Sequence, residues 1–344
     1  NSAGIVLSID KDIQTVIQNV GNRELKKGAI VVMDPYNGEI KGAASFPSFT
    51  PTDLEKSIKD TENSPMINRA FLPFNVGSTF KIVTAAAALE AGIPMSEIAV
   101  CTGSVDVSGQ IIRCHKRDGH GTLDMLDAMK ESCNPYFIHL GQKVGGDALL
   151  AMAERFGFGQ GYQLAPNIYT ADGTLPSKQD MLNPAEVANL SFGQGKLTAT
   201  PVQVAQMMSV VANGGYLVAP KLVLGETLDG QTVDRTADIA PKQIISGEIA
   251  SQIQSFLIHC VMVADGQNAL PKKTTAGGKT GTAQTGRFDD EKKELEQGWF
   301  AGFFPASTPR YVVVVLSEET GYGNTTAAPV FSKIADALAE KVKE

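Results

Sequence analysis

Apolar residues recur every three or four positions near both ends of the chain, which predicts an amphipathic helix at each end. The first helix covers residues 10–27, where Asp10 is placed to cap the N-terminus. The second covers residues 328–343. Their apolar faces hold Ile13, Val16, Ile17 and Val20 in the first helix, and Val330, Phe331, Ile334, Ala335 and Leu338 in the second.

Shorter apolar runs bounded by turn residues predict five strands. Residues 29–33 and 39–45 flank the dipeptide Asn37-Gly38, which is a strong hairpin signal. Three further strands are predicted near the end of the chain, at residues 275–283, 298–304 and 310–317, and a polar loop at residues 284–297.

The middle of the chain, residues 78–258, is predicted to be mostly helical, with extended pieces at residues 110–114 and 216–230. If the five strands share one antiparallel sheet, the first and last helices can cover it. The sequence therefore predicts an α+β fold with two lobes: an α/β lobe of residues 1–77 plus 259–344, and a mainly helical lobe of residues 78–258.

Composition limits the function classes. The chain has 344 residues, and 43% are hydrophobic, which is enough for a substantial core. The net charge of −7 and the lack of a basic stripe argue against nucleic acid as a partner. The longest apolar runs are strand-sized, so neither a membrane span nor a signal peptide is expected.

Three short motifs lie in order along the chain, and together they indicate an acyl-transfer site. The first places a hydroxyl and an amine one helical turn apart, so the lysine can take the serine proton. The second offers a hydroxyl that relays protons and an amide that holds a substrate carbonyl. The third offers a cation on a strand. The motifs are Ser78-Thr79-Phe80-Lys81, Ser132-Cys133-Asn134 and Lys279-Thr280-Gly281-Thr282.

A single Ser-x-x-Lys pattern carries little weight, since about one is expected by chance in a chain of this length. Ser8 and Lys11 form a second such pair, but they lie at the start of the first predicted helix and no companion motif belongs to them. Ser-x-Asn and Lys-Thr-Gly each occur once, in the right order. The combination indicates the site.

The segment that follows Ser78 predicts a buried helix with this serine at its N-terminal end. It is apolar nearly all round and is stopped by Gly92 and Pro94. Lys81 is the only charged residue within residues 70–89. Burial would lower the pKa of Lys81 towards a value that suits a general base.

Over almost its whole length the chain resembles the transpeptidase domain of a class B penicillin-binding protein. The likeness goes beyond the three motifs. One departure is Val76, where the family usually has a proline before Gly-Ser; no catalytic atom is lost. The resembling segments are residues 28–35, 44–49, 68–69, 77–81, 191–195, 200–201, 212–215 and 299–303.

The resemblance implies a peptidoglycan D,D-transpeptidase that needs no cofactor and no metal. Ser78, with Lys81 as base, would attack the penultimate D-alanine carbonyl of a stem peptide, and D-alanine would leave. An amine of a neighbouring stem would then take the acyl group. β-Lactam antibiotics would mimic D-Ala-D-Ala and acylate Ser78.

The resemblance also implies roles for the other motif residues. Ser132 would pass a proton to the leaving amine, and Asn134 would bind the substrate amide. The backbone N–H groups of Ser78 and Thr282 would hold the oxyanion. Lys279 is counted with the catalytic residues, and the substrate-binding residues are Thr280, Gly281 and Thr282.

Other members of the superfamily are alternatives. Class D β-lactamases and β-lactam sensors usually have valine in place of the asparagine of Ser-x-Asn, so Asn134 speaks against them. A class A β-lactamase needs a dedicated glutamate, and neither Glu154 nor Glu186 has a supporting motif. A D,D-carboxypeptidase and a non-enzymatic scaffold are further alternatives, the latter disfavoured by the intact motifs.

Cys101 and Cys114 bracket a predicted hairpin and are followed by His115, Asp118 and His120. Three alternatives stay open: a zinc site, a disulfide across the hairpin, or two free thiols. The other cysteines and histidines are predicted to be packing or helix-face residues: Cys133, Cys260, His139 and His259.

Trp299, on the strand after Lys-Thr-Gly, is predicted to be a core residue. The polar loop at residues 284–297 supports the hypothesis that its charged tip lines the cleft and affects substrate choice. The tip holds Asp289, Asp290, Glu291, Lys292, Lys293 and Glu294.

Family members usually carry a membrane anchor and a pedestal domain before the catalytic domain. The chain starts at Asn1 without Met and holds neither, so it is expected to be the soluble catalytic part of a longer, processed protein. The resemblance implies a site on the extracytoplasmic face of the bacterial membrane. Its expected partners are peptidoglycan stem peptides, β-lactams and a membrane glycan polymerase.

Overall fold

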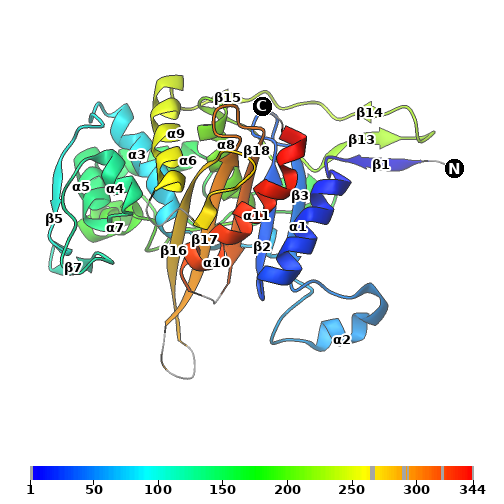
Figure 1. The fold of residues 1–344 in the computed structure, drawn as a ribbon, viewed down its shortest axis with the longest axis horizontal. Helices are drawn as coiled ribbons and strands as arrows, with labels where there is room; N and C mark the ends of the chain where they lie inside the picture. Colours follow the sequence, from blue (N-terminus) through cyan, green and yellow to red (C-terminus); the bar gives the residue numbers. More distant parts are fainter. Residues whose placement is uncertain (1–2, 264–267, 289–291, 293, 319–320, 343–344) are drawn as a thin grey trace.

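The computed structural model describes residues 3–263, 268–288, 292, 294–318 and 321–342. An antiparallel sheet of five strands lies at its centre, in the order β16-β17-β18-β2-β3 (Figure 1). The strands are β2 (Gly28–Met33), β3 (Ile40–Phe46), β16 (Gly277–Phe288), β17 (Glu294–Phe304) and β18 (Tyr311–Ser317). The first and last parts of the chain thus share one sheet.

The burial of each strand follows its place in the sheet. All residues of β2 are buried, and so are those of β18 after its first residue. Both strands are near-continuous apolar runs because helices cover both faces of the sheet. The edge strand β3 instead alternates buried and half-buried positions, since one of its faces is less covered.

Helices cover both faces of the sheet. Helix α1 (Lys11–Glu24) and helix α11 (Ala328–Leu338) lie side by side on one face (Figure 1). Asp10 caps α1 as predicted, by accepting hydrogen bonds from two backbone N–H groups. Helix α8 (Pro201–Ala212), which is buried along its whole length, packs on the other face.

The region between β3 and β16 supplies most of the remaining helices. They are α2 (Leu54–Lys59), α3 (Lys81–Glu90), α4 (Met125–Lys130), α5 (Asn134–Val144), α6 (Gly146–Arg155), α7 (Pro184–Ser191) and α9 (Gly247–Met262), and α10 (Gly323–Thr326) lies near the end of the chain. No helix of the described residues has both the length and the apolarity to cross a membrane.

Short strands pair at the margins of this region, and the sequence predicted few of them. The three-stranded sheet consists of β1 (Gly4–Leu7), β13 (Val223–Thr227) and β14 (Asp234–Arg235). The two-stranded pairs are β4 (Phe74–Asn75) with β11 (Thr198–Ala199), β5 (Ala99–Cys101) with β8 (Gly121–Leu123), β6 (Ser104–Val107) with β7 (Gln110–Arg113), β9 (Gln163–Ala165) with β10 (Ile168–Tyr169), and β12 (Tyr216–Leu217) with β15 (Lys242–Gln243).

The predicted α+β architecture is confirmed, but the predicted loop at residues 284–297 is wrong. Strands β16 and β17 continue into it, with Gln284 opposite Glu296 and Phe288 opposite Glu294. The β16 side of this hairpin end is largely exposed and the β17 side is half-buried, so the pairing leaves no apolar alternation in the sequence. Residues 289–291 and 293 of its tip lie outside the described residues. The division into lobes at residues 77 and 258 stays a prediction.

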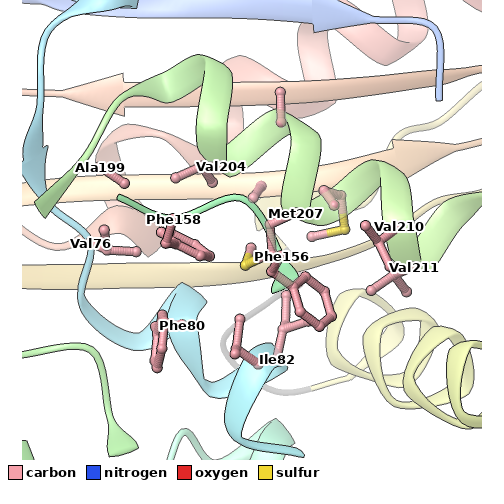
Figure 2. Close-up of a cluster of buried hydrophobic side chains, with 14 of the residues drawn as sticks. Val76, Phe80, Ile82, Phe156, Phe158, Ala199, Val204, Met207, Val210 and Val211 are labelled. Atoms are coloured by element: carbon pink, nitrogen blue, oxygen red, sulfur yellow. The ribbon is translucent and has the colours of Figure 1, made fainter. Parts of the chain in front are cut away.

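The core between α8 and α3 supports the turn that precedes α3. Figure 2 shows Phe80 and Ile82 pointing towards a cluster that includes Phe156, Phe158 and Met207. The rings of Phe80 and Phe158 meet edge to face, with centroids 5.4 Å apart. Phe80 is therefore fixed by packing on Phe158, in the same buried cluster as residues of α8, which ties this turn to the core.

We expect Phe331→Ala to lower the free energy of unfolding by about 3–5 kcal/mol, because it leaves a cavity between α11 and the sheet. The Phe331 side chain is fully buried against Phe300 and Phe304. Phe288→Ala is the matched control, since Phe288 is 62% exposed, and it should change stability by less than about 0.5 kcal/mol. Denaturant unfolding of both variants tests this; equal losses would contradict it.

Candidate active site

Ser78 lies in a tight turn, Gly77–Phe80, that leads into α3. Gly77 has a φ of +63°, and a Cβ there would lie 2.5 Å from the backbone oxygen of Thr282. The Gly77 N–H donates to the oxygen of Gly193 at 2.9 Å. The turn is thus held between β16 and the 191–195 segment, and only glycine fits before the serine.

The amino group of Lys81 joins the first motif to the second. Its Nζ lies 3.0 Å from Ser78 Oγ, 2.6 Å from the backbone oxygen of Ser132, 3.1 Å from Ser132 Oγ and 2.7 Å from Asn134 Oδ1. The Lys81 side chain is fully buried, as the sequence predicted. Two of its four partners, both carbonyl oxygens, can only accept hydrogen bonds.

These partners fit a neutral amine. Burial, and then the charge of Lys279, holds the pKa of Lys81 well below its usual range. A neutral amine donates two hydrogen bonds and accepts one. The carbonyl oxygens of Ser132 and Asn134 can take the two N–H groups, which leaves the lone pair for one hydroxyl, that of Ser78 or that of Ser132. Lys81 is therefore placed to accept a proton from Ser78.

Ser132 has a backbone conformation that glycine usually adopts. Its φ is +51°, in the left-handed region. The N–H of Ser132 donates to Met129 O at 3.2 Å, and the N–H of Cys133 donates to Ala128 O at 3.0 Å. This pair of bonds is the Schellman motif at the end of α4, with Ser132 at the position where glycine is commonest. The strained turn presents both oxygens of Ser132 to Lys81.

The third motif lies on β16, beside the Ser78 turn. Lys279 is 2% exposed, and its Nζ donates to the oxygen of Thr280 at 3.1 Å. A Cβ on Gly281 would lie 2.9 Å from Thr79 Cγ2, so the glycine of Lys-Thr-Gly lets β16 approach the turn closely. The Thr282 hydroxyl accepts from the N–H of Gly323 at 3.3 Å.

The segment before Ser78 is held at Asn75, which bonds to the side chains of Trp299 and Gln297. The indole N–H of Trp299, which is fully buried as predicted, donates to Asn75 O at 2.8 Å. Gln297 Oε1 accepts from the Asn75 N–H at 3.0 Å. Neither Asn75 nor Gln297 belongs to a recognisable motif, so pattern alone could not find them.

The structure brings the four polar residues of the first two motifs into direct contact and sets β16 alongside them. It does not bring Ser8 to the site. The Ser8 hydroxyl donates to Ile40 O at 2.7 Å, and Lys11 begins α1. Reading this second Ser-x-x-Lys pair as a helix start is therefore confirmed.

The cysteine group differs from the one that the sequence suggested. Cys101, Cys114, His120 and Cys133 have their Sγ and imidazole nitrogen atoms within 4.8 Å of one another. His115 and Asp118, by contrast, have exposed side chains. Cys133 is buried as predicted, but it also belongs to this group.

Comparison with known proteins identifies the family. The profile of the penicillin-binding protein transpeptidase domain matches residues 28–336. The chain therefore belongs to this family, which confirms the resemblance read from the motifs.

Among curated proteins, stage V sporulation protein D of Bacillus subtilis is 36% identical over 97% of this chain. The chain spans about half of that relative, 53% of its length. Among solved structures, the D,D-transpeptidase domain of a peptidoglycan glycosyltransferase from Eggerthella lenta matches 99% of the chain and 84% of its own, with a TM-score of 0.85 and 26% identity. The penicillin G acyl-enzyme of penicillin-binding protein A from Mycobacterium tuberculosis matches 97% of the chain and 80% of its own, with a TM-score of 0.84 and 26% identity.

Two substitutions at Ser132 separate the backbone strain from the hydroxyl. Both Ser132→Gly and Ser132→Ala remove the hydroxyl contact with Lys81 and keep the backbone one, but only glycine relieves the left-handed conformation. We expect the glycine variant to be more stable than the alanine variant by about 1 kcal/mol. Denaturant unfolding of the pair measures this difference. Equal stabilities would mean that the turn is not strained.

Proposed function

We propose that the chain is a serine D,D-transpeptidase that cross-links peptidoglycan stem peptides. Ser78 Oγ attacks the carbonyl carbon of the penultimate D-alanine while Lys81 takes the hydroxyl proton. The peptide bond breaks, D-alanine leaves with a proton on its amine, and an ester on Ser78 remains. The amine of a second stem then attacks this ester, forms the cross-link and returns the proton to Ser78.

The observation that carries the proposal is the set of contacts around Lys81. A buried lysine with a lowered pKa and a serine hydroxyl whose Oγ lies 3.0 Å from its Nζ form an activated nucleophile pair. The relatives support the same chemistry, since one solved neighbour is named a D,D-transpeptidase domain and another a penicillin G acyl-enzyme.

The other motif residues complete the mechanism. Ser132 Oγ, 3.1 Å from Lys81 Nζ, relays the proton to the leaving amine, and Asn134 holds the substrate amide. Lys279, helped by Thr280 and Thr282 on β16, binds the terminal carboxylate of the donor peptide, and Gly281 between them completes the substrate-binding strand. The backbone N–H groups of Ser78 and Thr282 stabilise the oxyanion of the tetrahedral intermediate.

The proposal extends to place and partners. Stem peptides lie outside the cytoplasm, so the protein that contains this chain acts on the extracytoplasmic face of the bacterial membrane. A membrane glycan polymerase that supplies new strands is its proposed partner. β-Lactams are its covalent inhibitors, because their strained amide takes the place of the D-Ala-D-Ala peptide bond.

Incubation with benzylpenicillin tests the proposal directly. We expect a single covalent adduct, located on the peptide that contains Ser78, in intact-mass and peptide-mapping measurements. Ser78→Ala should form none, because it removes the attacking oxygen while α3 stays intact. Ser8→Ala, which alters the second Ser-x-x-Lys pair, is the matched control and should be acylated normally.

The lifetime of this adduct distinguishes a transpeptidase from a hydrolase. An adduct that persists for hours supports the proposal, because a hydrolase must release the acyl group to water to turn over. Loss within minutes, with release of penicilloic acid, would indicate a β-lactamase. Wild-type protein that forms no adduct would contradict acyl transfer at Ser78 altogether.

The pH dependence of acylation reports on Lys81. The neutral amine is the reactive form, so the rate should rise with pH as Lys81 loses its proton, with a midpoint well below the usual lysine range. Lys279→Gln removes a positive charge that lowers this pKa, so it should move the midpoint to higher pH. Lys279→Arg keeps the charge and should leave the midpoint in place. Coinciding midpoints in both variants would contradict this account.

A further inference from the structure

Four side chains that can bind a metal meet beside the second motif. Cys101 ends β5, Cys114 follows β7, His120 precedes β8, and Cys133 lies between Ser132 and α5. These elements lie together at the end of the helical region (Figure 1). One ligand atom from each side chain lies within 4.8 Å of all the others. Such convergence of three thiols and one imidazole from four segments is the donor set of a structural zinc site.

The spacing fits tetrahedral coordination. Zinc lies about 2.3 Å from thiolate sulfur and about 2.0–2.1 Å from imidazole nitrogen, so ligand atoms at the corners of a tetrahedron are about 3.5–3.8 Å apart. Cys114 Sγ and His120 Nδ1 are 3.5 Å apart. A small contraction of the other separations, all at most 4.8 Å, completes the tetrahedron.

His120 has the environment of a metal ligand. Its side chain is 2% exposed, and its Nε2 is a buried nitrogen without a hydrogen bond among the described residues. Glu131 Oε2 lies 3.8 Å from this Nε2. Zinc-bound histidines commonly direct their second N–H to a carboxylate, which fixes Nδ1 as the ligand atom. Nδ1 is the atom that faces Cys114.

The backbone around the cluster is built for close approach. Cys101 pairs with Gly121, the residue after His120, in the β5–β8 ladder. Gly119 has a φ of +82°, and a Cβ there would lie 2.2 Å from the oxygen of Cys101. The glycines on both sides of His120 thus let its loop fold over Cys101.

We propose that Cys101, Cys114, His120 and Cys133 bind one Zn²⁺ ion, and that this ion fixes the segment that carries Ser132 and Asn134. Cys133 is the link, because it stands between these two residues in the chain. Both of its neighbours contact Lys81 Nζ. The other three ligands anchor Cys133 to the β5–β8 region, so the ion would act as a positioning group for the active site.

Zinc accounts for the composition of the cluster better than a disulfide does. A disulfide joins two thiols, and would leave the third thiol and the buried imidazole of His120 unused. Simple packing of free thiols does not explain why an imidazole nitrogen, His120 Nδ1, faces the three thiols and lies 3.5 Å from Cys114 Sγ. Three thiolates and one imidazole are ligands that zinc prefers.

Metal analysis tests the binding site independently of the proposed function. Protein prepared without a polyhistidine tag or chelator should contain about one zinc per chain by plasma mass spectrometry. Cys101→Ser and His120→Ala should lose most of it. The matched controls are His115→Ala, which changes an exposed imidazole next to Cys114, and Cys260→Ala, which removes the buried cysteine outside the group. Both control variants should keep about one zinc per chain.

Wild-type protein alone can decide the question if the ligand variants do not fold. Fully reduced, chelator-treated protein should take up one equivalent of Co²⁺ with the visible absorption of tetrahedral thiolate cobalt, and Zn²⁺ should abolish the signal. Less than one tenth of an equivalent of either metal after reduction would overturn the site. Full zinc retention in His120→Ala would overturn the assigned ligand set.

The positioning role rests on the proposed function and has its own readout. Acylation by benzylpenicillin should slow about tenfold in chelator-treated protein and recover when zinc returns, as expected when a supporting contact of a site is lost. The midpoint of the pH profile should also rise, because a displaced second motif exposes Lys81 to water. An unchanged rate and midpoint in zinc-free protein would overturn the positioning role, whatever the metal content.

Discussion

The amino group of Lys81 is the interaction on which the rest of the active site depends. It is fully buried, and burying such a group without hydrogen-bond partners costs several kcal/mol, about 2–7 for a neutral polar group. Its partners come from two separate segments, the Ser78 turn and the Ser132–Asn134 turn. Each contact therefore both stabilises the fold and places a reactive atom. Movement of either turn would take partners away from the buried amine, so the fold itself enforces the catalytic geometry.

Close backbone approach is the second constraint, and the sheet provides it. β16 is an edge strand, so β17 pairs with one side of it and the other side is free to face the Ser78 turn. Gly77 and Gly281 remove the side chains that would keep the turn and the strand apart. Packing of Phe80 against Phe158 fixes the turn from below. Lys-Thr-Gly thus needs its glycine because a side chain there would collide with Thr79. Its lysine supplies a positive charge that lowers the pKa of Lys81.

The sequence predicted features that repeat or that carry a motif. Helices α1 and α11 and the central strands follow from apolar spacing, and the active site follows from the order of three motifs. The paired end of β16 and β17 was missed because a hairpin end that is exposed or half-buried has no apolar alternation. The left-handed Ser132 was missed because serine occupies a position where glycine is the usual signal. Cys133 was read as a packing residue because its partners, such as His120, are distant in sequence.

The Ser132–Asn134 segment shows why strain and buried polar groups occur together at this site. A serine with a φ of +51° persists only where its surroundings fix it. The end of α4 fixes it by two backbone hydrogen bonds, and Lys81 fixes it by contacts with its oxygens and with Asn134. The side chain of Cys133, between Ser132 and Asn134, instead joins the cluster of Cys101, Cys114 and His120. A metal there would hold the same three residues from the side that Lys81 does not reach. The strained turn would then be fixed from both sides, which is what a proton relay needs, since a shift of an ångström would separate Ser132 from the lysine.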